Sequence, residues 1–152
     1  FRGVGRRFEV SKLYFSKQAH VLIDDYGHHP AEILATIQAA REKFPRLKIC
    51  MIFEPHRFTR TQQLFDDFVK VLSKVDFLLL LDIYPASEKP IKGISSKKLI
   101  SKIKKNHKNA HYIGNKDPIN WLKENHHSFS VLITQGAGTI SKLNIEIKKK
   151  WQ

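Results

Sequence analysis

Apolar runs of strand length alternate along the chain with segments whose apolar residues recur at helical spacing. The expected strands are HVLID from His20, KICMIF from Lys48, DFLLLLDI from Asp76, AHYI from Ala110 and SVLIT from Ser130. Strands that are apolar throughout and separated by helices are typical of a parallel sheet covered on both faces. The pattern therefore predicts an α/β fold, a Rossmann-like open and mostly parallel sheet with helices on both faces.

The helices are expected between these strands, where apolar residues fall three or four positions apart. Three such sets are Ile33, Ile37, Ala40 and Phe44, then Leu64, Phe65, Phe68, Val69 and Leu72, and then Leu99, Ile100 and Ile103. Asp117 and Pro118 form an N-cap and first-turn pair for a fourth helix. A last helix should run from about Thr139 into the lysine-rich tail.

The N-terminal segment RRFEVSKLYFS alternates like a half-exposed strand. It should add an antiparallel edge strand to the sheet or form part of a linker. Because the chain starts at Phe1 rather than Met and begins abruptly, we expect a domain of a longer polypeptide. Residues 1–17 are then the end of an interdomain linker with a possible edge strand, and residues 18–152 are one domain.

Composition narrows the class of protein. With 152 residues and 41% apolar side chains, the chain can bury one ordinary core. No run of about 18 apolar residues is present, so no membrane span is expected. No signal peptide is visible and the single Cys50 cannot form an internal disulfide, which favours a cytoplasmic location.

The formal charge of +13 raises the possibility of a nucleic-acid partner. Most of the excess lies in KKLISKIKKNHKN and KIKKKW, where lysines are spaced between apolar residues as on the solvated face of a helix. Aromatic residues are not interleaved with them as in a base-stacking surface. The pattern favours solvated helix faces, and a polyanion-binding surface stays the alternative.

Titratable and glycine-bearing segments follow four of the five strands: DDYGHHP, EPHRFTRT, DIYPASEKPIKG and QGAGT. Ligands of open α/β sheets bind outside the carboxyl ends of the strands. These segments, far apart in sequence, should therefore meet at one edge of the sheet and form a site there.

Each residue of that edge has more than one interpretation. Asp24 and Asp25 could cap the turn or accept hydrogen bonds from a ribose. His28 and His29 are adjacent and point in different directions, so one of them is expected to be structural. Together with His56 they suggest zinc, but no Cys joins them and their spacing fits no standard site, so no metal site is predicted.

Arg57 and Arg60 lie three positions apart near the expected start of a helix. With the backbone N–H groups there, they could bind a phosphate or a carboxylate. Surface salt bridges are the alternative for either arginine. QGAGT could approach a ligand closely or serve only as a strand-to-helix turn.

The chain contains no GxxxxGK[ST] phosphate loop, no GxGxxG after a strand and no GxSxG nucleophile elbow. It has no standard means of holding a triphosphate by itself. The residues at the predicted edge would therefore form only part of a site, which lacks its own phosphate loop.

Five segments resemble, in order and spacing, the C-terminal domain of the Mur ligases of peptidoglycan synthesis: GVGRRFE, DDYGHHPAEI, MIFEPHRFTRTQQLFDDF, DIYPASEKPIKG and QGAGTISK. The segment PHRFTR favours the L-alanine-adding branch of the family over the branch that recycles murein tripeptide. The resemblance implies an upstream UDP-sugar-binding domain and a central ATPase domain that would hold most of the ATP and Mg²⁺. ATP would phosphorylate the carboxyl group of UDP-N-acetylmuramate, and the amine of L-alanine would attack the acyl phosphate. The C-terminal domain alone would be inactive.

The resemblance also implies roles for particular residues. It places Arg7, Asp25 and Tyr26 against ATP, and His28, His56, Arg57 and Arg60 against the substrates, with His56, Arg57 and Arg60 as the catalytic residues. No general base is implied, so the domain would act by positioning and electrostatics. Glu54 stands where the family usually has Gln, which would bring a negative charge beside the arginines.

Overall fold

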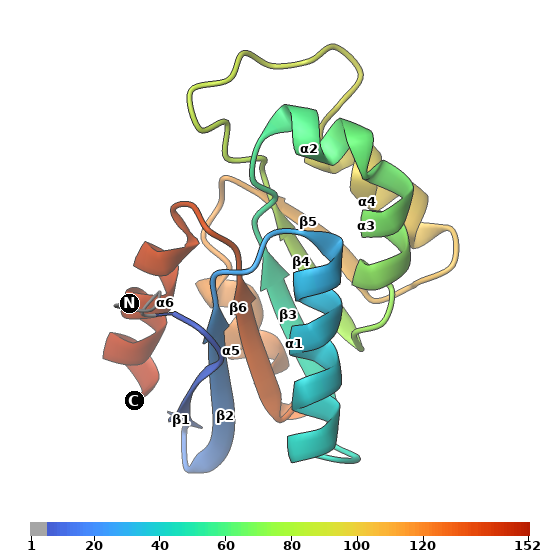
Figure 1. Ribbon diagram of the computed structural model, residues 1–152. Helices are drawn as coiled ribbons and strands as arrows, with labels where there is room; N and C mark the ends of the chain where they lie inside the picture. The colour runs from blue at the N-terminus through green and yellow to red at the C-terminus, as the bar shows by residue number, and fades with distance from the viewer. Residues whose placement is uncertain (1–5) are drawn as a thin grey trace, which may run out of the picture.

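The computed structural model describes residues 6–152 as a six-stranded sheet in the order β1-β2-β6-β3-β4-β5 (Figure 1). The strands are β1 Glu9–Phe15, β2 Gln18–Asp25, β3 Ile49–Phe53, β4 Phe77–Leu81, β5 Ala110–Gly114 and β6 Val131–Gln135. All neighbouring strands are parallel except β1 and β2, which pair antiparallel. The predicted α/β sheet with one antiparallel edge strand is confirmed.

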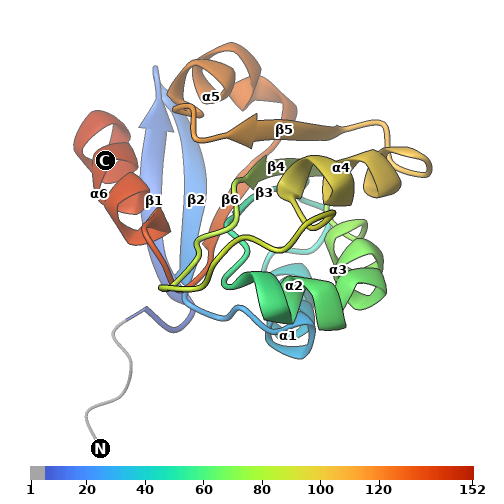
Figure 2. The same ribbon diagram turned by 90° about the horizontal axis from the view of Figure 1, so that it is seen from above.

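Helices cover both faces of the sheet (Figure 2). One face carries α1 Pro30–Lys43, α2 Phe58–Gln63, α3 Phe65–Leu72 and α4 Ser96–Lys104, and the other carries α5 Ile119–Asn125 and α6 Ile140–Trp151. A short 3₁₀ helix, His126–Ser128, follows α5. Strands β3 and β6 are buried along their whole length, because they lie in the middle of the sheet between the two helix layers.

The N-terminal segment belongs to the sheet from Glu9 onward. Leu13 and Phe15 of β1 are buried in a hydrophobic cluster that also contains residues of α6. Val10 and Tyr14, on the other face of the strand, are 42% and 46% exposed. This alternation is the half-exposed pattern expected from the sequence. The linker assigned to residues 1–17 stays a prediction, and its first five residues lie outside the described part of the chain.

Two helix boundaries differ from the sequence prediction. A separate six-residue helix, α2, precedes α3, and the two meet at Leu64. Helix α5 begins at Ile119, one residue later than expected, so Pro118 rather than Asp117 is its N-cap. Asp117 Oδ1 still accepts a hydrogen bond from the Ile119 N–H at 3.0 Å. No helix between residues 6 and 152 has the length and apolar character needed to cross a membrane.

The loops that follow β2, β3 and β6 meet at one edge of the sheet. The Gly136 N–H donates to the Asp25 carbonyl at 3.0 Å, and the Glu54 N–H donates to the Gln135 carbonyl at 3.1 Å. The carboxyl ends of parallel strands must lie at the same edge, and these two bonds continue the strand pairing into the loops. The predicted convergence is confirmed for these loops.

Candidate functional site

Asp24, the next-to-last residue of β2, is a structural residue. It is 3% exposed, and Arg6 donates to both of its carboxylate oxygens, from Nε at 2.8 Å and from Nη2 at 2.9 Å. The Thr134 hydroxyl donates to the same carboxylate at 2.7 Å. Asp24 therefore ties the N-terminal segment and β6 to β2.

Asp25 shapes the turn and also borders a groove. Its Oδ1 accepts from the Gly27 N–H at 2.8 Å and from Gln135 Nε2 at 3.0 Å, while its Oδ2 accepts from the Phe8 N–H at 3.0 Å. The groove, of about 350 Å³, runs between the N-terminal segment and α1, and Arg7, Asp25 and Tyr26 all line it. The three residues assigned to ATP by the resemblance therefore share one groove.

Arg7 and Tyr26 form the outer wall of this groove. The Arg7 guanidinium carbon lies 4.8 Å from the centre of the Tyr26 ring, and its Nη2 donates to the Tyr26 hydroxyl. A cation over an aromatic face is attracted by the ring quadrupole. The pair forms a flat, positively charged surface.

The two adjacent histidines have different tasks. His29 is the N-cap of α1: its Nδ1 accepts from the Ala31 N–H at 3.1 Å, and Glu32 accepts in return from the His29 N–H at 3.0 Å. His28 is half-buried, and its ring centre lies 5.2 Å from that of His56. His29 is therefore structural, and His28 faces the loop after β3.

His56 lies between aromatic and cationic neighbours. Its ring stacks on Tyr84 at 5.3 Å, and Arg60 Nη1 donates to the His56 carbonyl at 2.9 Å and lies 3.4 Å from its Nδ1. Burial lowers the pKa of His56, and the positive charges of His28, Arg60 and Arg57 lower it further. At neutral pH the uncharged imidazole is therefore the favoured form of His56. We call His28, His56, Arg57 and Arg60 the histidine–arginine cluster.

Arg57 occupies a strained backbone position at the start of α2. Its φ is 79°, in the left-handed region that residues other than glycine rarely adopt, and its N–H donates to the Tyr84 carbonyl at 2.8 Å. None of the salt bridges between residues 6 and 152 involves Arg57 or Arg60. The surface-salt-bridge alternative is therefore wrong for both within this part of the chain.

The first two backbone amides of α2, those of Phe58 and Thr59, are already bonded. Glu88, in the loop after β4, accepts from the Phe58 N–H at 2.6 Å, from the Thr59 N–H at 3.1 Å and from the Thr59 hydroxyl. The Thr59 hydroxyl is the main cause of the lowered pKa of Glu88, and the backbone donors and Arg57 add to it. The expectation that these amides bind an external anion is wrong, because the protein's own carboxylate takes them. An external anion would therefore be held by the guanidinium groups of Arg57 and Arg60 rather than by the Phe58 and Thr59 amides.

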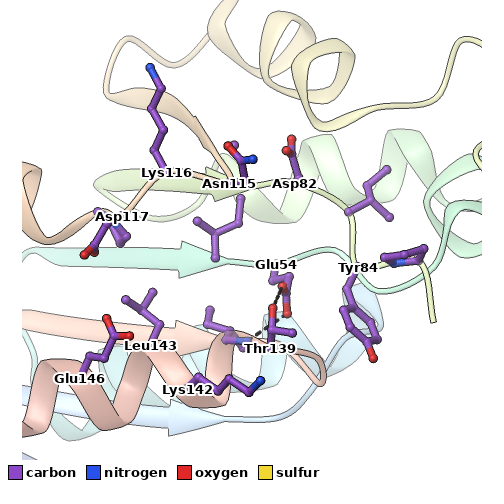
Figure 3. A pocket seen from close by; sticks show the side chains of 16 residues that line it. Glu54, Asp82, Tyr84, Asn115, Lys116, Asp117, Thr139, Lys142, Leu143 and Glu146 are labelled. Atoms are coloured by element: carbon purple, nitrogen blue, oxygen red, sulfur yellow. Dashed lines mark hydrogen bonds between the residues drawn. The ribbon is translucent and has the colours of Figure 1, made fainter. Parts of the chain in front are cut away.

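The segment QGAGT is a strand-to-helix turn built around Glu54. The Glu54 carboxylate, 5% exposed as a residue, accepts from the Thr139 hydroxyl at 2.6 Å and from the Ile140 N–H at 3.1 Å (Figure 3). Burial raises its pKa, although these donors oppose the shift. Glu54 is thus bonded to the start of α6, and no ion pair between residues 6 and 152 joins it to Arg57 or Arg60.

The structure also contains a groove that the sequence analysis missed. It lies between α6 and the loops after β4 and β5, has a volume of about 480 Å³, and is bordered by Asp82, Tyr84, Asn115 and Lys142 (Figure 3). Tyr84 separates this groove from His56. The only sequence signal for it is the long polar segment after β4. Between residues 6 and 152, no group of three or more His, Cys, Asp or Glu residues could hold a metal ion.

Comparisons with known proteins match this architecture. A family profile described as "Mur ligase, glutamate ligase domain" matches residues 6–138. The UDP-N-acetylmuramate–L-alanine ligase of Psychrobacter arcticus is 48% identical over 97% of this chain, which spans 31% of that protein.

Two solved structures share the fold. The UDP-N-acetylmuramate–alanine ligase of Thermotoga maritima superposes with a TM-score of 0.69 at 27% identity, covering 99% of this chain and 30% of that one. A murein peptide ligase of Psychrobacter arcticus gives a TM-score of 0.70 at 17% identity, covering 98% of this chain and 30% of that one, and shows the fold alone. The profile match and the 48% identical relative together establish that this chain belongs to the Mur ligase family.

Proposed function

We propose that this chain is the C-terminal domain of an ATP-dependent ligase that joins L-alanine to UDP-N-acetylmuramate through an acyl phosphate in peptidoglycan synthesis. The observation that carries the proposal is the 48% identity to an L-alanine-adding ligase over nearly the whole chain. Because this chain spans less than a third of that protein, the sugar-binding and ATPase functions would come from other domains of the same polypeptide. Such an enzyme would work in the cytoplasm.

The histidine–arginine cluster is the proposed contact for L-alanine. The exposed Arg57 guanidinium has no acceptor between residues 6 and 152, and the half-buried Arg60 lies one helical turn away. Two guanidinium groups can bind a carboxylate and lower the cost of negative charge nearby. His28 and His56 close the inner side of this surface. His56, in its neutral form, can accept or donate a hydrogen bond without adding a third positive charge.

The groove at Arg7, Asp25 and Tyr26 is the proposed contact for ATP. Its donors and acceptors fit a nucleotide, because the Arg7 guanidinium suits a phosphate, the Tyr26 ring suits a flat base or sugar face, and the Asp25 carboxylate suits a ribose hydroxyl. ATP would supply the phosphoryl group that activates the muramoyl carboxyl group, and Mg²⁺ would offset the phosphate charge. This domain would orient the nucleotide and exclude water from it.

Ligase assays on the full-length protein test this proposal. We expect ATP-dependent phosphate release that requires both UDP-N-acetylmuramate and L-alanine, and no turnover from residues 1–152 alone. Replacing L-alanine by the L-alanyl-γ-D-glutamyl-diaminopimelate tripeptide tests the recycling branch. Faster turnover with the tripeptide, or turnover by this chain alone, would contradict the proposal.

A variant of the cluster tests the role of its arginines. R57A should raise the KM for L-alanine by about 10-fold or more, the scale of one charge-assisted hydrogen bond, with a smaller change in the KM for ATP. R7A should show the reverse preference. Equal effects of each variant on both substrates would contradict the division into two contact surfaces.

A further inference from the structure

A third groove lies at the amino ends of β3, β4 and β6. These strands begin at the lower end of the sheet in Figure 1. The groove has a volume of about 390 Å³. Its polar side chains are Arg46, Lys48, His127, Ser128 and Ser130. The histidine–arginine cluster follows the carboxyl ends of β2 and β3, whereas this groove lies at the amino ends of the strands. The length of the strands therefore separates the groove from the cluster. We call this cavity the amino-edge groove.

The polar lining of the amino-edge groove consists of cationic, imidazole and hydroxyl groups, with no carboxylate. The ion pairs found between residues 6 and 152 join other residues, namely Arg6 with Asp24, Arg41 with Asp76, and Lys102 with Asp66. Arg46 and Lys48 are therefore positive charges without an acidic partner in that part of the chain. On a chain with a formal charge of +13, such a concave cluster concentrates positive potential.

The acidic residue beside the groove does not cancel this charge. Asp76 directly precedes Phe77, which lines the groove, but its Oδ2 accepts from Arg41 Nη1 at 3.0 Å and from the Ile49 N–H at 2.8 Å. Arg41 thus neutralises Asp76. An anion in the groove would meet the donors of Arg46 and Lys48 with little repulsion from this carboxylate.

The donors are carried by two segments that are bonded to each other. The N–H groups of Ser130 and Val131 both donate to the Lys48 carbonyl, at 3.0 and 3.1 Å, so the start of β6 holds the start of β3. Arg46 has a φ of 69°, a left-handed conformation in which a side chain costs about 1 kcal/mol or more relative to glycine. A glycine would relieve this strain, yet the chain places an arginine there, at the rim of the groove.

We propose that the amino-edge groove binds the phosphate group of a small organic phosphate ester. Arg46 and Lys48 match the charge of a phosphate, and the Ser128 and Ser130 hydroxyls can donate to its remaining oxygens. Leu47 and Phe77 supply an apolar wall for the organic part of the ester. The ligand is thus distinguished from free phosphate by this wall and from a neutral apolar molecule by the cations.

Titration of the 152-residue chain with phenyl phosphate, followed by backbone amide NMR shifts, tests the proposal. We expect saturable shifts at residues 46–48 and 127–130, tighter binding than for inorganic phosphate, and no such shifts with phenol. R46G removes the guanidinium while glycine accepts the positive φ, so the variant should fold and bind about 10-fold more weakly. K48Q should weaken binding to a similar extent.

Lys149 on the exposed side of α6 provides the matched control, because K149Q makes the same change in net charge as K48Q. Its affinity for phenyl phosphate should stay within about twofold of the unchanged chain, since Lys149 does not line the groove and salt screens exposed charges. An equal loss in K149Q and K48Q would overturn the proposal in favour of diffuse attraction of anions to a basic surface. Absence of saturable shifts at the groove, or equal binding of phenol, would overturn it as well.

Discussion

The Glu88 carboxylate accepts a hydrogen bond from the Phe58 N–H at 2.6 Å, across 30 positions of sequence. This bond attaches the loop after β4 to the first turn of α2, the helix that carries Arg60 and begins next to Arg57. A carboxylate at a helix N-terminus accepts from otherwise unpaired N–H groups and interacts favourably with the helix dipole. Glu88 therefore holds the two arginines in place from outside the site.

E88Q should loosen α2 without unfolding the domain. The amide keeps the size of the side chain but loses the charge and one acceptor oxygen. We expect faster hydrogen exchange at the Phe58 and Thr59 amides and, in the full-length enzyme, a rise of about threefold to tenfold in the KM for L-alanine. T59A removes one of the same hydrogen bonds and should give a smaller change in the same direction. Unchanged exchange at both amides in E88Q would show that Glu88 does not restrain α2.

The sheet could be predicted from the sequence because its signals are local. The run from Val131 to Ile133 and the run from Ile49 to Phe53 are apolar throughout, as is typical of strands covered on both faces. The rule that ligands bind at the carboxyl ends of the strands then brought His28 and Arg57 to one edge.

Other features of the site depend on partners that are distant in sequence. Nothing near Phe58 indicates that Glu88 occupies its amide, and nothing near Glu54 indicates that its carboxylate turns toward Thr139, 85 positions away. The different tasks of His28 and His29 follow from the exact start of α1, and helix boundaries are the least certain part of a pattern-based prediction. Long-range hydrogen bonds leave no periodic trace in the sequence.

The lowered pKa of His56 predicts a contribution to stability that depends on pH. Because the folded pKa lies below the ordinary value of 6.5, the unfolded chain binds more protons in this range. The free energy of unfolding should therefore rise with pH from below the folded pKa up to about 6.5, and become constant above it. Urea unfolding at pH 5.5 and pH 7.5 measures this difference.

H56Q should reduce the gain in stability between these two pH values without abolishing it. Burial also lowers the pKa values of His111 and His126, so these residues contribute in the same direction. A pH dependence that is equal or steeper in H56Q would contradict the assignment of a lowered pKa to His56.

Glu54 should tolerate replacement by Gln far better than by Ala. E54A leaves the Thr139 hydroxyl and the buried Ile140 N–H without their acceptor, which should lower the free energy of unfolding by about 1–3 kcal/mol. In E54Q the amide oxygen keeps one of the two bonds, so we expect a change below about 1 kcal/mol. Urea unfolding at pH 7.5 measures both, and equal losses would show that the acceptor atoms are unimportant.

The pH dependence of E54Q provides a second check on Glu54. Burial raises the folded pKa above the ordinary value of 4.5, so ionisation of Glu54 costs folding free energy and its contribution falls as the pH rises through that range. Relative to the unchanged chain, E54Q should therefore be more stable at pH 7.5 than at pH 4.5. The opposite trend would mean that Thr139 and Ile140 stabilise the charged form more than burial opposes it.

Gly136, in the turn after β6, should be difficult to replace. Its φ is 144°, and a Cβ added there would lie 2.9 Å from the Glu54 carbonyl oxygen and 3.2 Å from Ile140 Cγ2. Because the close oxygen belongs to the backbone, G136A must move β3 or α6, and we expect a loss of about 2 kcal/mol or more in the free energy of unfolding.

G93A is the matched control: its φ is also positive, at 83°, but the nearest atom to the added Cβ is the flexible Lys98 Nζ at 3.7 Å. G93A should therefore cost only the backbone strain, about 1 kcal/mol. If both variants lose the same free energy, the close approach of the loops after β3 and β6 contributes nothing beyond the conformation of a single residue.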